Sequence, residues 1–435
     1  MHKVLFAASE AAPMAKVGGL GDVIGSLPKA LAAVGVEPAI ILPRYETIPR
    51  DGLKPVIESQ PVIYNGEPET VAVYEGSLPD TEIPVFYVEN EKYLSKGGPI
   101  YFSKSAIAEH DAEFHRFHFF SHAVYALLTD KILPFTPDVV HANDWHTGIL
   151  VELLKISPQP LPTVFTIHNL ANQGVFRDRN SLAEGIRHAT AVTTVSETYA
   201  KEIQMPVYGA GLDALLRTVR PVGILNGVDY GTLPAPRDRA EAKAALQKEL
   251  GLTVDPAVPV FGLVSRLVEQ KGIHLIGKAL ERFVSEANAQ FVFLGVGEDR
   301  YENMLRGYAE KYPKNVSANL FFSEETANAI YQGSDFFLMP SLFEPSGLGQ
   351  MIAMYYGTVP IVRKTGGLAD SVTAETGFVF DDPKPEALEG AVGDAVKAFA
   401  DAERMAALRD RCRKQDFSWK RSAMEYAKLY DKIRI

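Results

Sequence analysis

The sequence is poor in cysteine and in long apolar runs. Its single cysteine, Cys412, cannot form an internal disulfide, which fits a reducing compartment. No apolar run approaches the roughly 18 residues that a membrane-spanning helix needs. The apolar stretch within Met1–Glu10 is too short for a signal peptide and runs into an acid. We therefore expect a cytoplasmic protein that does not associate with membranes.

Basic side chains are fewer than acidic ones. The 435 residues include 54 acidic and 44 basic side chains, a formal net charge of −10. General binding to nucleic acid or to anionic membranes needs a cationic surface, so neither is expected. Apolar residues make up 46% and charged residues 23%, as in ordinary globular proteins. The length favours two or three domains of roughly 150–200 residues each.

Several catalytic motifs are missing. No Asp-x-Asp occurs, which removes a common way of holding a divalent metal on a pyrophosphate. No Gly-x-Ser-x-Gly occurs, so an α/β-hydrolase would lack its nucleophile. No Gly-Lys-Ser/Thr follows the glycine-rich segments, which excludes a P-loop. Cys412 has no glycine or histidine neighbours that would mark a nucleophile, so we expect it to be a partly buried bystander.

Short apolar runs alternate with longer helical stretches. Near-continuous apolar character is typical of strands buried on both faces of a parallel sheet, so the alternation predicts α/β domains with doubly wound sheets. The expected strands are residues 4–8, 39–42, 83–88, 138–141, 163–168, 191–195, 260–264, 291–294, 335–339 and 359–362. The clearest expected helices are residues 22–33, 114–128 and 348–356.

One glycine-rich segment occurs twice. Val17–Val23 reads Val-Gly-Gly-Leu-Gly-Asp-Val, and Thr365–Asp370 reads Thr-Gly-Gly-Leu-Ala-Asp. Each leads into a predicted helix, which favours two similar α/β domains that face each other across a cleft. An irregular turn at Asn226–Asp229 marks the break. We predict one domain over residues 1–222 and a second over residues 223–418.

Two glycine-rich or basic loops could bind phosphate. In Lys16–Asp22, glycines let backbone N–H groups approach an anion and Lys16 adds a charge; the alternative is a tight strand-to-helix turn. The segment is not a dinucleotide fingerprint, because Ile24 stands where the next glycine is required. In Ser265–Gly272, which follows a buried strand, Arg266 and Lys271 could neutralise phosphates; the alternative is a solvated basic turn.

Two further segments follow strands of the second half. In Phe343–Gln350, Glu344 could accept hydrogen bonds from hydroxyl groups, and a helix is expected to start near Gly347. The alternative for Glu344 is an exposed loop acid. Thr365–Leu368 is another helix start that suits an anion.

Polar residues also end strands of the first half. His168 ends an apolar strand and could bond a hydroxyl group or stabilise developing charge; alternatively it is a satisfied edge residue. Asp144 follows another strand and could line a cleft or cap the next helix.

A row of possible metal ligands lies on one predicted helix. Asp111, His115, His118 and His122 are spaced to share one face. The same helix carries an apolar stripe, so the histidines could instead flank the buried face. We expect the second arrangement and no metal site.

Taken together, these motifs resemble the bacterial glycogen synthase and plant starch synthase family. The similarity is collective, spans most of the chain and keeps the family's order. It is carried by residues 8–10, 16–23, 143–147, 166–170, 224–229, 265–267, 270–272, 344–345 and 363–370. The resemblance implies two facing Rossmann-like domains with an interdomain cleft, the GT-B architecture. It also implies that a final helix, here Trp419–Ile435, returns to the N-terminal domain.

The resemblance further implies transfer of glucose from ADP-glucose to the non-reducing end of an α-1,4-glucan, glycogen or a malto-oligosaccharide, with retention and without metal or cofactor. Residues 1–222 would hold the acceptor and residues 223–418 the donor. The roles that it implies are catalytic for Glu344, Arg266, Lys271 and His168, and substrate-binding for Lys16, Gly19, Asp22, Asp144, Asn169, Ser346, Gly347, Leu348, Thr365, Gly366 and Gly367.

Two positions depart from related patterns. Ser346 stands where the family commonly has Cys, and Ile352 stands where the broader retaining family places a second Glu. The chain is also somewhat short for the family. The residues do not separate ADP-glucose from UDP-glucose. The alternatives are another retaining glycosyltransferase, a catalytically silent glucan-binding homologue, or a dehydrogenase, against which the broken glycine fingerprint counts.

Overall fold

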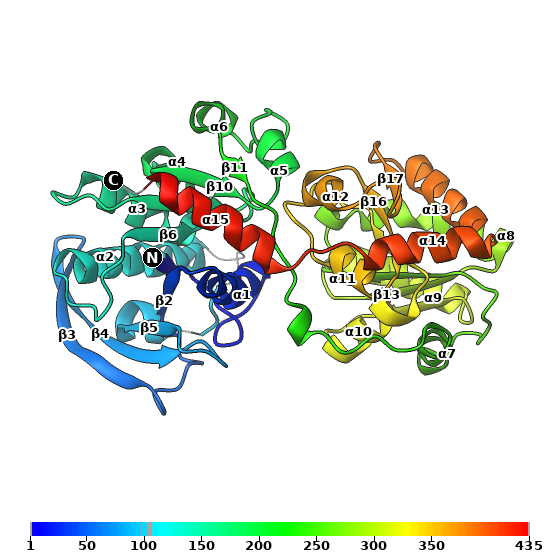
Figure 1. Cartoon of the computed structure of the whole chain (residues 1–435), viewed down its shortest axis with the longest axis horizontal. Coiled ribbons are helices and arrows are strands. Elements are labelled where there is room, and N and C mark those ends of the chain that lie inside the picture. The colour runs from blue at the N-terminus through cyan, green and yellow to red at the C-terminus, as the bar shows by residue number, and fades with distance from the viewer. Residues whose placement is uncertain (1, 97, 102–106, 434–435) are drawn as a thin grey trace. The chain divides into compact units, whose positions relative to one another are not determined.

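The protein consists of two compact units. The computed structural model describes residues 2–96, 98–101 and 107–433. For residues 107–110 it describes the backbone only. Unit 1 comprises Met1–Gly227 and Ser418–Ile435, and unit 2 comprises Val228–Phe417. The predicted boundary after residue 222 lies a few residues before the observed division after Gly227. Figure 1 shows that the last two long helices belong to different units.

Unit 1 is built on a nine-stranded sheet in the order β11-β10-β7-β6-β1-β2-β5-β4-β3. The strands from β11 to β5 are parallel, and β5, β4 and β3 pair antiparallel. Their bounds are β1 (Lys3–Ala7), β2 (Glu37–Pro43), β3 (Lys54–Tyr64), β4 (Glu67–Ser77), β5 (Pro84–Glu89), β6 (Val139–Asn143), β7 (Thr163–Ile167), β10 (Ala191–Thr194) and β11 (Val222–Gly223). A separate two-stranded sheet pairs β8 (Val175–Phe176) with β9 (Arg179–Asn180).

The antiparallel hairpin β3–β4 was not predicted. Its strands are half-exposed, so they lack the continuous apolar runs on which the strand predictions relied. The signal was in the connection: Asn65 and Gly66 both have positive φ, 51° and 81°, as a two-residue hairpin turn requires.

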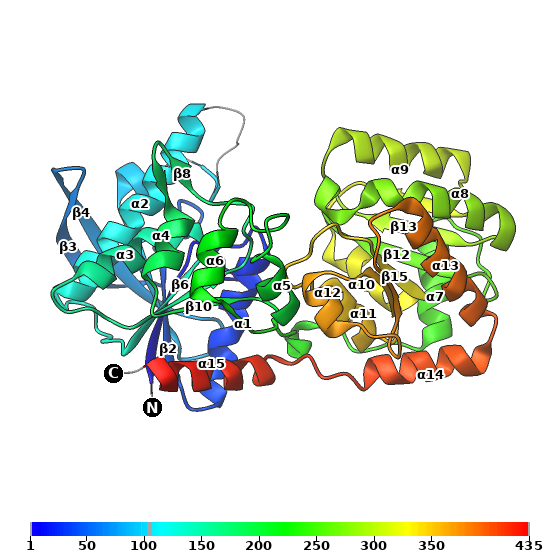
Figure 2. The same cartoon turned by 90° about the horizontal axis from the view of Figure 1, so that it is seen from above.

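Helices cover both faces of the unit 1 sheet. Their bounds are α1 (Gly19–Ala33), α2 (Ile107–Thr129), α3 (Gly148–Ile156), α4 (Ser181–His188), α5 (Glu197–Glu202), α6 (Asp213–Val219) and α15 (Trp419–Ile433). Alternate residues of β1 separate two cores: Val4 and Phe6 pack with α1 and α15, whereas Leu5 and Ala7 pack with α2 and α3. The helix α15 therefore returns to unit 1 and packs against α1 (Figures 1 and 2). Residues 434 and 435 of the predicted final helix lie outside the described part.

Unit 2 is built on a six-stranded, wholly parallel sheet in the order β14-β13-β12-β15-β16-β17. The strands are β12 (Val260–Val264), β13 (Gln290–Leu294), β14 (Val316–Asn319), β15 (Phe336–Met339), β16 (Val359–Arg363) and β17 (Phe378–Phe380). On one face the rings of Phe261, Phe291 and Phe336 stack in a row, with centroids 5.0 Å apart at each step.

The helices of unit 2 are α7 (Arg239–Glu249), α8 (Ile276–Ala287), α9 (Asp299–Lys311), α10 (Glu324–Gly333), α11 (Gly349–Tyr355), α12 (Gly366–Ser371), α13 (Pro385–Phe399) and α14 (Ala402–Arg413). One core packs α8, α9, α13 and α14 on the sheet, and a second packs α7, α10 and α11 on the other face. Both units are thus α/β layers built on parallel strands, with an antiparallel edge in unit 1, which confirms the predicted Rossmann-like class.

The predicted strands recur within one or two residues of their expected ends, because burial on both faces gives them an unbroken apolar pattern. The first helix begins at Gly19 rather than Asp22, and the helix after β15 begins at Gly349 rather than near Gly347. Gly347 has φ +69°, so a left-handed residue precedes that helix. Cys412 is fully buried, its thiol donates to the carbonyl of Thr376, and burial raises its pKa to about 12.

A buried ionic cluster closes the amino end of the unit 2 sheet. Asp335 is 2% exposed and lies 2.6 Å from the guanidinium of Arg409 and 2.8 Å from Nζ of Lys243. It also accepts the amide proton of Val260 at 3.0 Å, which ties two neighbouring strands together. Removing one partner of such a pair leaves the other charge buried without compensation.

We predict that Asp335→Asn lowers the stability of unit 2 by about 3–5 kcal/mol. The check is hydrogen exchange of the β12 and β15 amides across a urea series. The matched control is Glu286→Gln, which breaks an exposed pair with Arg282 and should cost only about 0.3–0.5 kcal/mol. Equal effects of the two substitutions would contradict the assigned role of Asp335.

A buried histidine joins α15 to the unit 1 sheet. His141 is 1% exposed; its Nδ1 lies 2.7 Å from the hydroxyl of Tyr430 and its Nε2 lies 2.6 Å from Oγ1 of Thr166. Burial, with a smaller contribution from His168, lowers the pKa of His141 from 6.5 to about 3. The folded protein therefore keeps this ring neutral at pH values where the unfolded chain protonates it.

We predict that the free energy of unfolding of unit 1 falls as pH drops from about 6.5 toward 3, because the unfolded chain takes up protons that the folded chain cannot. In His141→Gln the slope against pH becomes shallower by up to about 1.4 kcal/mol per pH unit. Urea unfolding followed by tryptophan fluorescence measures it, since Trp145 and Trp419 both belong to unit 1. The control Tyr430→Phe lowers stability without flattening the slope.

Candidate functional site

Three neighbouring strands of unit 2 end in the predicted donor-side loops. In the order β12, β15, β16, they lead into Arg266, Glu344 and Thr365. The carboxyl ends of parallel strands meet at one edge of a sheet, where doubly wound folds bind ligands. The structure therefore brings these residues to one edge, as the sequence analysis expected.

Lys271 and Glu344 form an ion pair at this edge. Nζ of Lys271 lies 2.6 Å from Oε2 of Glu344, and the hydroxyl of Ser341 donates to the same oxygen at 2.9 Å. The side chains are only 17% and 7% exposed. Glu344 is therefore not an exposed loop acid, and it holds Lys271 in place.

Glycines lock the Glu344 loop against the start of α12. Gly366 has φ +44°, and a Cβ there would lie 1.9 Å from the carbonyl oxygen of Glu344. A Cβ on Gly367 would lie 2.0 Å from the carbonyl oxygen of Ser346. The amide of Gly367 donates to the Glu344 carbonyl at 3.0 Å. This amide is thus used within the protein, and Thr365, fully buried, begins the turn.

The turn between Glu344 and α11 presents backbone amides. Gln350 donates through Nε2 to the carbonyls of Ser346 and Gly347, at 3.2 Å and 3.0 Å. These two bonds hold the turn in place. Over the described part of the chain, the amides of Gly347 and Leu348 make no hydrogen bond. The hydroxyl of Ser346 is buried and, within the same residues, has no hydrogen-bond partner.

Arg266 is exposed. Among the described residues, its guanidinium makes neither a hydrogen bond nor an ion pair, in contrast to Lys271. The backbone around it is nevertheless fixed, because Leu267 pairs with Gly297 in the loop after β13. The arrangement is a fixed loop that carries an uncommitted cation.

The polar residues of unit 1 also gather at one sheet edge. Glu10, Asp144 and His168 follow β1, β6 and β7, which are adjacent in the sheet. His168 donates through Nε2 to the side-chain oxygen of Asn143 at 2.9 Å. Burial lowers the pKa of His168 to about 3, so the ring is neutral near pH 7.

Asp144 is a strained, buried carboxylate. Its φ is +54°, and its Oδ1 accepts the amide protons of His168 at 2.7 Å and Asn169 at 3.4 Å. The helical turn that follows it receives no cap from this side chain, so the capping interpretation is wrong. Burial raises the pKa of Asp144 to about 7; the charge of Glu10 acts in the same direction and the two backbone bonds act against it.

The predicted anion-binding loop of unit 1 leads directly into α1. Nζ of Lys16 lies 2.7 Å from Oδ1 of Asp22, and both side chains are well exposed. A Cβ on Gly19 would meet nothing within 4 Å, whereas one on Gly21 would lie 3.1 Å from Glu10. Packing therefore requires Gly21, while the space beside Gly19 is open to a ligand.

The histidines of α2 pack around one tyrosine. The Tyr64 hydroxyl lies 2.7 Å from Nδ1 of His115 and 3.3 Å from Nδ1 of His118. Burial, with smaller contributions from His122 and other neighbours, lowers the pKa of His118 to about 3. The possible metal-ligand group found among the described residues lies elsewhere, at Glu152, Glu184 and His188, and arginines already pair with both carboxylates.

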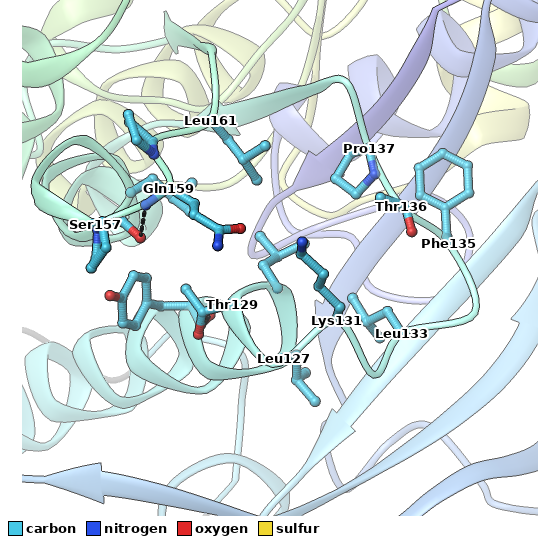
Figure 3. Close-up of a pocket in the computed structure, with 15 residues that line it drawn as sticks. Leu127, Thr129, Lys131, Leu133, Phe135, Thr136, Pro137, Ser157, Gln159 and Leu161 are labelled. Carbon is cyan, nitrogen blue, oxygen red and sulfur yellow. Dashed lines mark hydrogen bonds between the residues drawn. The ribbon is translucent and has the colours of Figure 1, made fainter.

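A pocket of about 470 Å³ lies at the other end of unit 1. It is lined by the ends of α2 and α3 and by the segments that lead into β6 and β7, including Lys131, Phe135 and Gln159 (Figure 3). None of the predicted site residues lines it. It is therefore separate from the sheet edge that carries Asp144 and His168.

Sequence reasoning gave no role to several residues that hold the site together. Ser341 supports Glu344, Asn143 supports His168 and Gln350 supports the Ser346–Leu348 turn. Glu10, noted only as part of a motif, is buried beneath the Lys16 loop. For Glu10, Asn143 and Ser341 the available signal was position, because each lies at the end of a buried parallel strand or within a few residues of it; Gln350 lies in α11 and had no such signal.

Among the described residues, no helix is both long enough and apolar enough to span a membrane.

Comparison with known proteins bears on both units. Residues 3–218 match the family model described as starch synthase catalytic domain, and residues 251–415 match glycosyl transferases group 1. A glycogen synthase of Gloeobacter violaceus is 42% identical, with 99% of each chain aligned, and one of Geotalea daltonii is 40% identical, with 98% of each aligned.

A solved structure covers the whole chain. The catalytic domain of starch synthase IV from Arabidopsis thaliana, bound to ADP and acarbose, superposes with a TM-score of 0.86 at 31% identity, covering 99% of both chains. The similarity thus extends over both units. The chain belongs to the glycogen and starch synthase family of GT-B glycosyltransferases.

Proposed function

We propose that this protein transfers glucose from ADP-glucose to the non-reducing end of an α-1,4-glucan with retention of configuration. The observation that carries the proposal is the Lys271–Glu344 pair on the same sheet edge as the uncommitted Arg266, in a chain that matches glycogen synthases over its full length. Arg266 and Lys271 supply cations for the leaving diphosphate, and Glu344 beside them supplies a hydrogen-bond acceptor for the sugar hydroxyls.

The donor's diphosphate is bound by unit 2. Arg266 offers a planar set of donors for phosphate oxygens, and Lys271 offers a point charge already oriented by Glu344. Thr365, Gly366 and Gly367 bring the backbone close beside them. Because Glu344 holds Lys271 before substrate arrives, the lysine charge stabilises the leaving anion without reorganising.

The glucose ring is held by the turn between β15 and α11. Glu344 accepts hydrogen bonds from sugar hydroxyls, and the unused amides of Gly347 and Leu348 donate to them. The unpartnered hydroxyl of Ser346 is available at the same turn. Serine retains the backbone contact and a polar side chain where relatives commonly carry cysteine.

Unit 1 provides the acceptor side. His168, Asp144 and Asn169 line the sugar and acceptor hydroxyls, while Lys16, Gly19 and Asp22 contact the donor. His168 acts as a neutral hydrogen-bonding group, since its pKa is about 3. Asp144, whose pKa is about 7, accepts hydrogen bonds when ionised and donates one when protonated.

The reaction proceeds on one face of the sugar. The bond from glucose C1 to the diphosphate oxygen breaks, and the glucan 4-hydroxyl forms the new C1–O bond on the same face. Its proton passes to the departing phosphate oxygen. The sequence offers no second acid to pair with Glu344, and Ile352 stands where the broader retaining family places its second glutamate. Catalysis therefore depends on positioning and on stabilisation of the leaving charge.

We predict that Arg266→Ala and Lys271→Ala each reduce kcat by roughly a few hundred-fold, the cost of losing one preorganised charge contact. Steady-state nucleotide release measures it, with circular dichroism to confirm folding. The matched control is Lys278→Ala, which removes an exposed lysine from α8 and should leave kcat unchanged. Near-wild-type turnover in both variants would contradict the assignment of the phosphate contacts.

We predict release of ADP from ADP-glucose that depends on added glycogen and persists with a chelator. ADP-glucose and UDP-glucose are assayed side by side, each with glycogen, maltose or glucose 1-phosphate as acceptor, and NMR coupling constants give the configuration of the new linkage. Transfer only to glucose 1-phosphate would indicate a different glycosyltransferase. Glucan binding without nucleotide release from either donor would indicate a catalytically silent homologue.

A further inference from the structure

Glu10 is a buried carboxylate directly beyond β1, and the mechanism above gives it no role. It is 3% exposed. Its Oε2 accepts the amide protons of Val17 at 2.7 Å and Gly18 at 2.8 Å. Its Oε1 accepts the hydroxyl proton of Tyr101 at 2.5 Å. Both oxygens of the carboxylate are therefore occupied by fixed donors.

These donors are neutral. Among the described residues, no lysine, arginine or histidine forms an ion pair with Glu10, whereas Glu344 and Asp335 both have cationic partners. Burying a carboxylate without a counter-charge is costly unless hydrogen bonds replace the lost water. At Glu10 the replacement bonds come from two consecutive amides of the Lys16 loop.

The first turns of α1 fit closely around this carboxylate. A Cβ on Gly21 would lie 3.1 Å from Oε2 of Glu10 and 3.2 Å from Cγ of Lys16. One on Gly25 would lie 2.7 Å from the carbonyl oxygen of Ala12. The backbone between Glu10 and α1 is thus closely packed, and the first carbons of the Lys16 side chain take part in this packing.

The Tyr101 hydroxyl extends the contact to the rest of the edge. It lies 2.9 Å from the hydroxyl of Ser9, and the ring stacks on His146 with centroids 5.2 Å apart. His146 follows Asp144 by two residues in the loop after β6. Glu10 therefore joins the Lys16 loop to the loop that carries Asp144.

We propose that Glu10 is a positioning residue that fixes Lys16 and Gly19 for donor binding by holding the amides of Val17 and Gly18. The proposal rests on the proposed function, in which this loop contacts the donor. Glu10 acts on the donor through the Lys16 loop and not by direct contact. Its loss raises the KM for donor and leaves the KM for glucan unchanged, whereas general destabilisation would change both alike or neither.

The test compares Glu10→Ala, Glu10→Gln and Tyr101→Phe. Glu10→Ala should raise the donor KM by about ten-fold or more, since small misplacements of binding groups are costly. Glu10→Gln keeps an amide oxygen for the two N–H donors and should restore most of the affinity. Tyr101→Phe should give an intermediate effect. Glu37→Gln, at the opposite end of neighbouring β2, is the matched control and should behave as wild type.

A double-mutant cycle with Lys16→Ala gives the decisive readout. If Glu10 acts through Lys16, the fold-changes in donor KM from Glu10→Ala and Lys16→Ala are not multiplicative in the double variant. Multiplicative effects, or an unchanged donor KM in a folded Glu10→Ala protein, overturn the proposal.

Hydrogen exchange at the Val17 and Gly18 amides separates this proposal from the proposed function. Protection should fall in Glu10→Ala and persist in Glu10→Gln whether or not the enzyme turns over. If wild-type protein uses neither sugar nucleotide, the proposed function is wrong while exchange still reports the contact. If exchange is unchanged in Glu10→Ala, the positioning role is wrong whatever the activity.

Discussion

Buried carboxylates that follow parallel strands must find hydrogen-bond donors, and the geometry of both units depends on how they find them. Glu10, Asp144 and Glu344 each lie just beyond a strand and are at most 8% exposed. Glu10 and Asp144 bind backbone amides of neighbouring loops, and Glu344 binds Lys271 and Ser341. Because an unsatisfied buried carboxylate is so unfavourable, each one fixes the loop that satisfies it. The loops of the candidate site are thereby held by contacts within the protein.

The choice of partner sets the chemistry of each carboxylate. Glu344 has a lysine beside it, and the two side chains form a nearly buried ion pair. Asp144 has only amides, and burial outweighs them, so its pKa rises to about 7. The histidines at the same edge, His146 and His168, are kept neutral by burial, with pKa values of about 3. At the described sheet edges, unit 1 therefore carries buried neutral imidazoles and an acid with a raised pKa, whereas unit 2 carries the Lys271–Glu344 ion pair.

The sequence allowed prediction of the fold class and of the loops that carry the site, because buried parallel strands have an unbroken apolar pattern and the site residues follow them directly. Half-exposed strands lack this pattern, and β3–β4 was missed although Asn65-Gly66 is a hairpin signal. Contacts between distant segments could not be predicted either. Nothing local to Glu10 indicates that it meets Val17, Gly18 and Tyr101, and nothing local to Asp144 indicates that its carboxylate turns to His168 instead of capping its own helix.

The glycines show how this limit arises. Gly19 and Gly367 belong to matching Gly-Gly-Leu segments, and the sequence analysis gave both the same anion-binding role. In the structure, the space beside Gly19 is open, whereas Gly367 lies against Ser346 and donates its amide to Glu344. The segment at Gly19 thus leaves open space, and the segment at Gly367 braces the loop that carries Glu344. Contacts exclude a side chain at Gly367 but not at Gly19, so matching sequences lie in different surroundings, and only the neighbours of each glycine distinguish them.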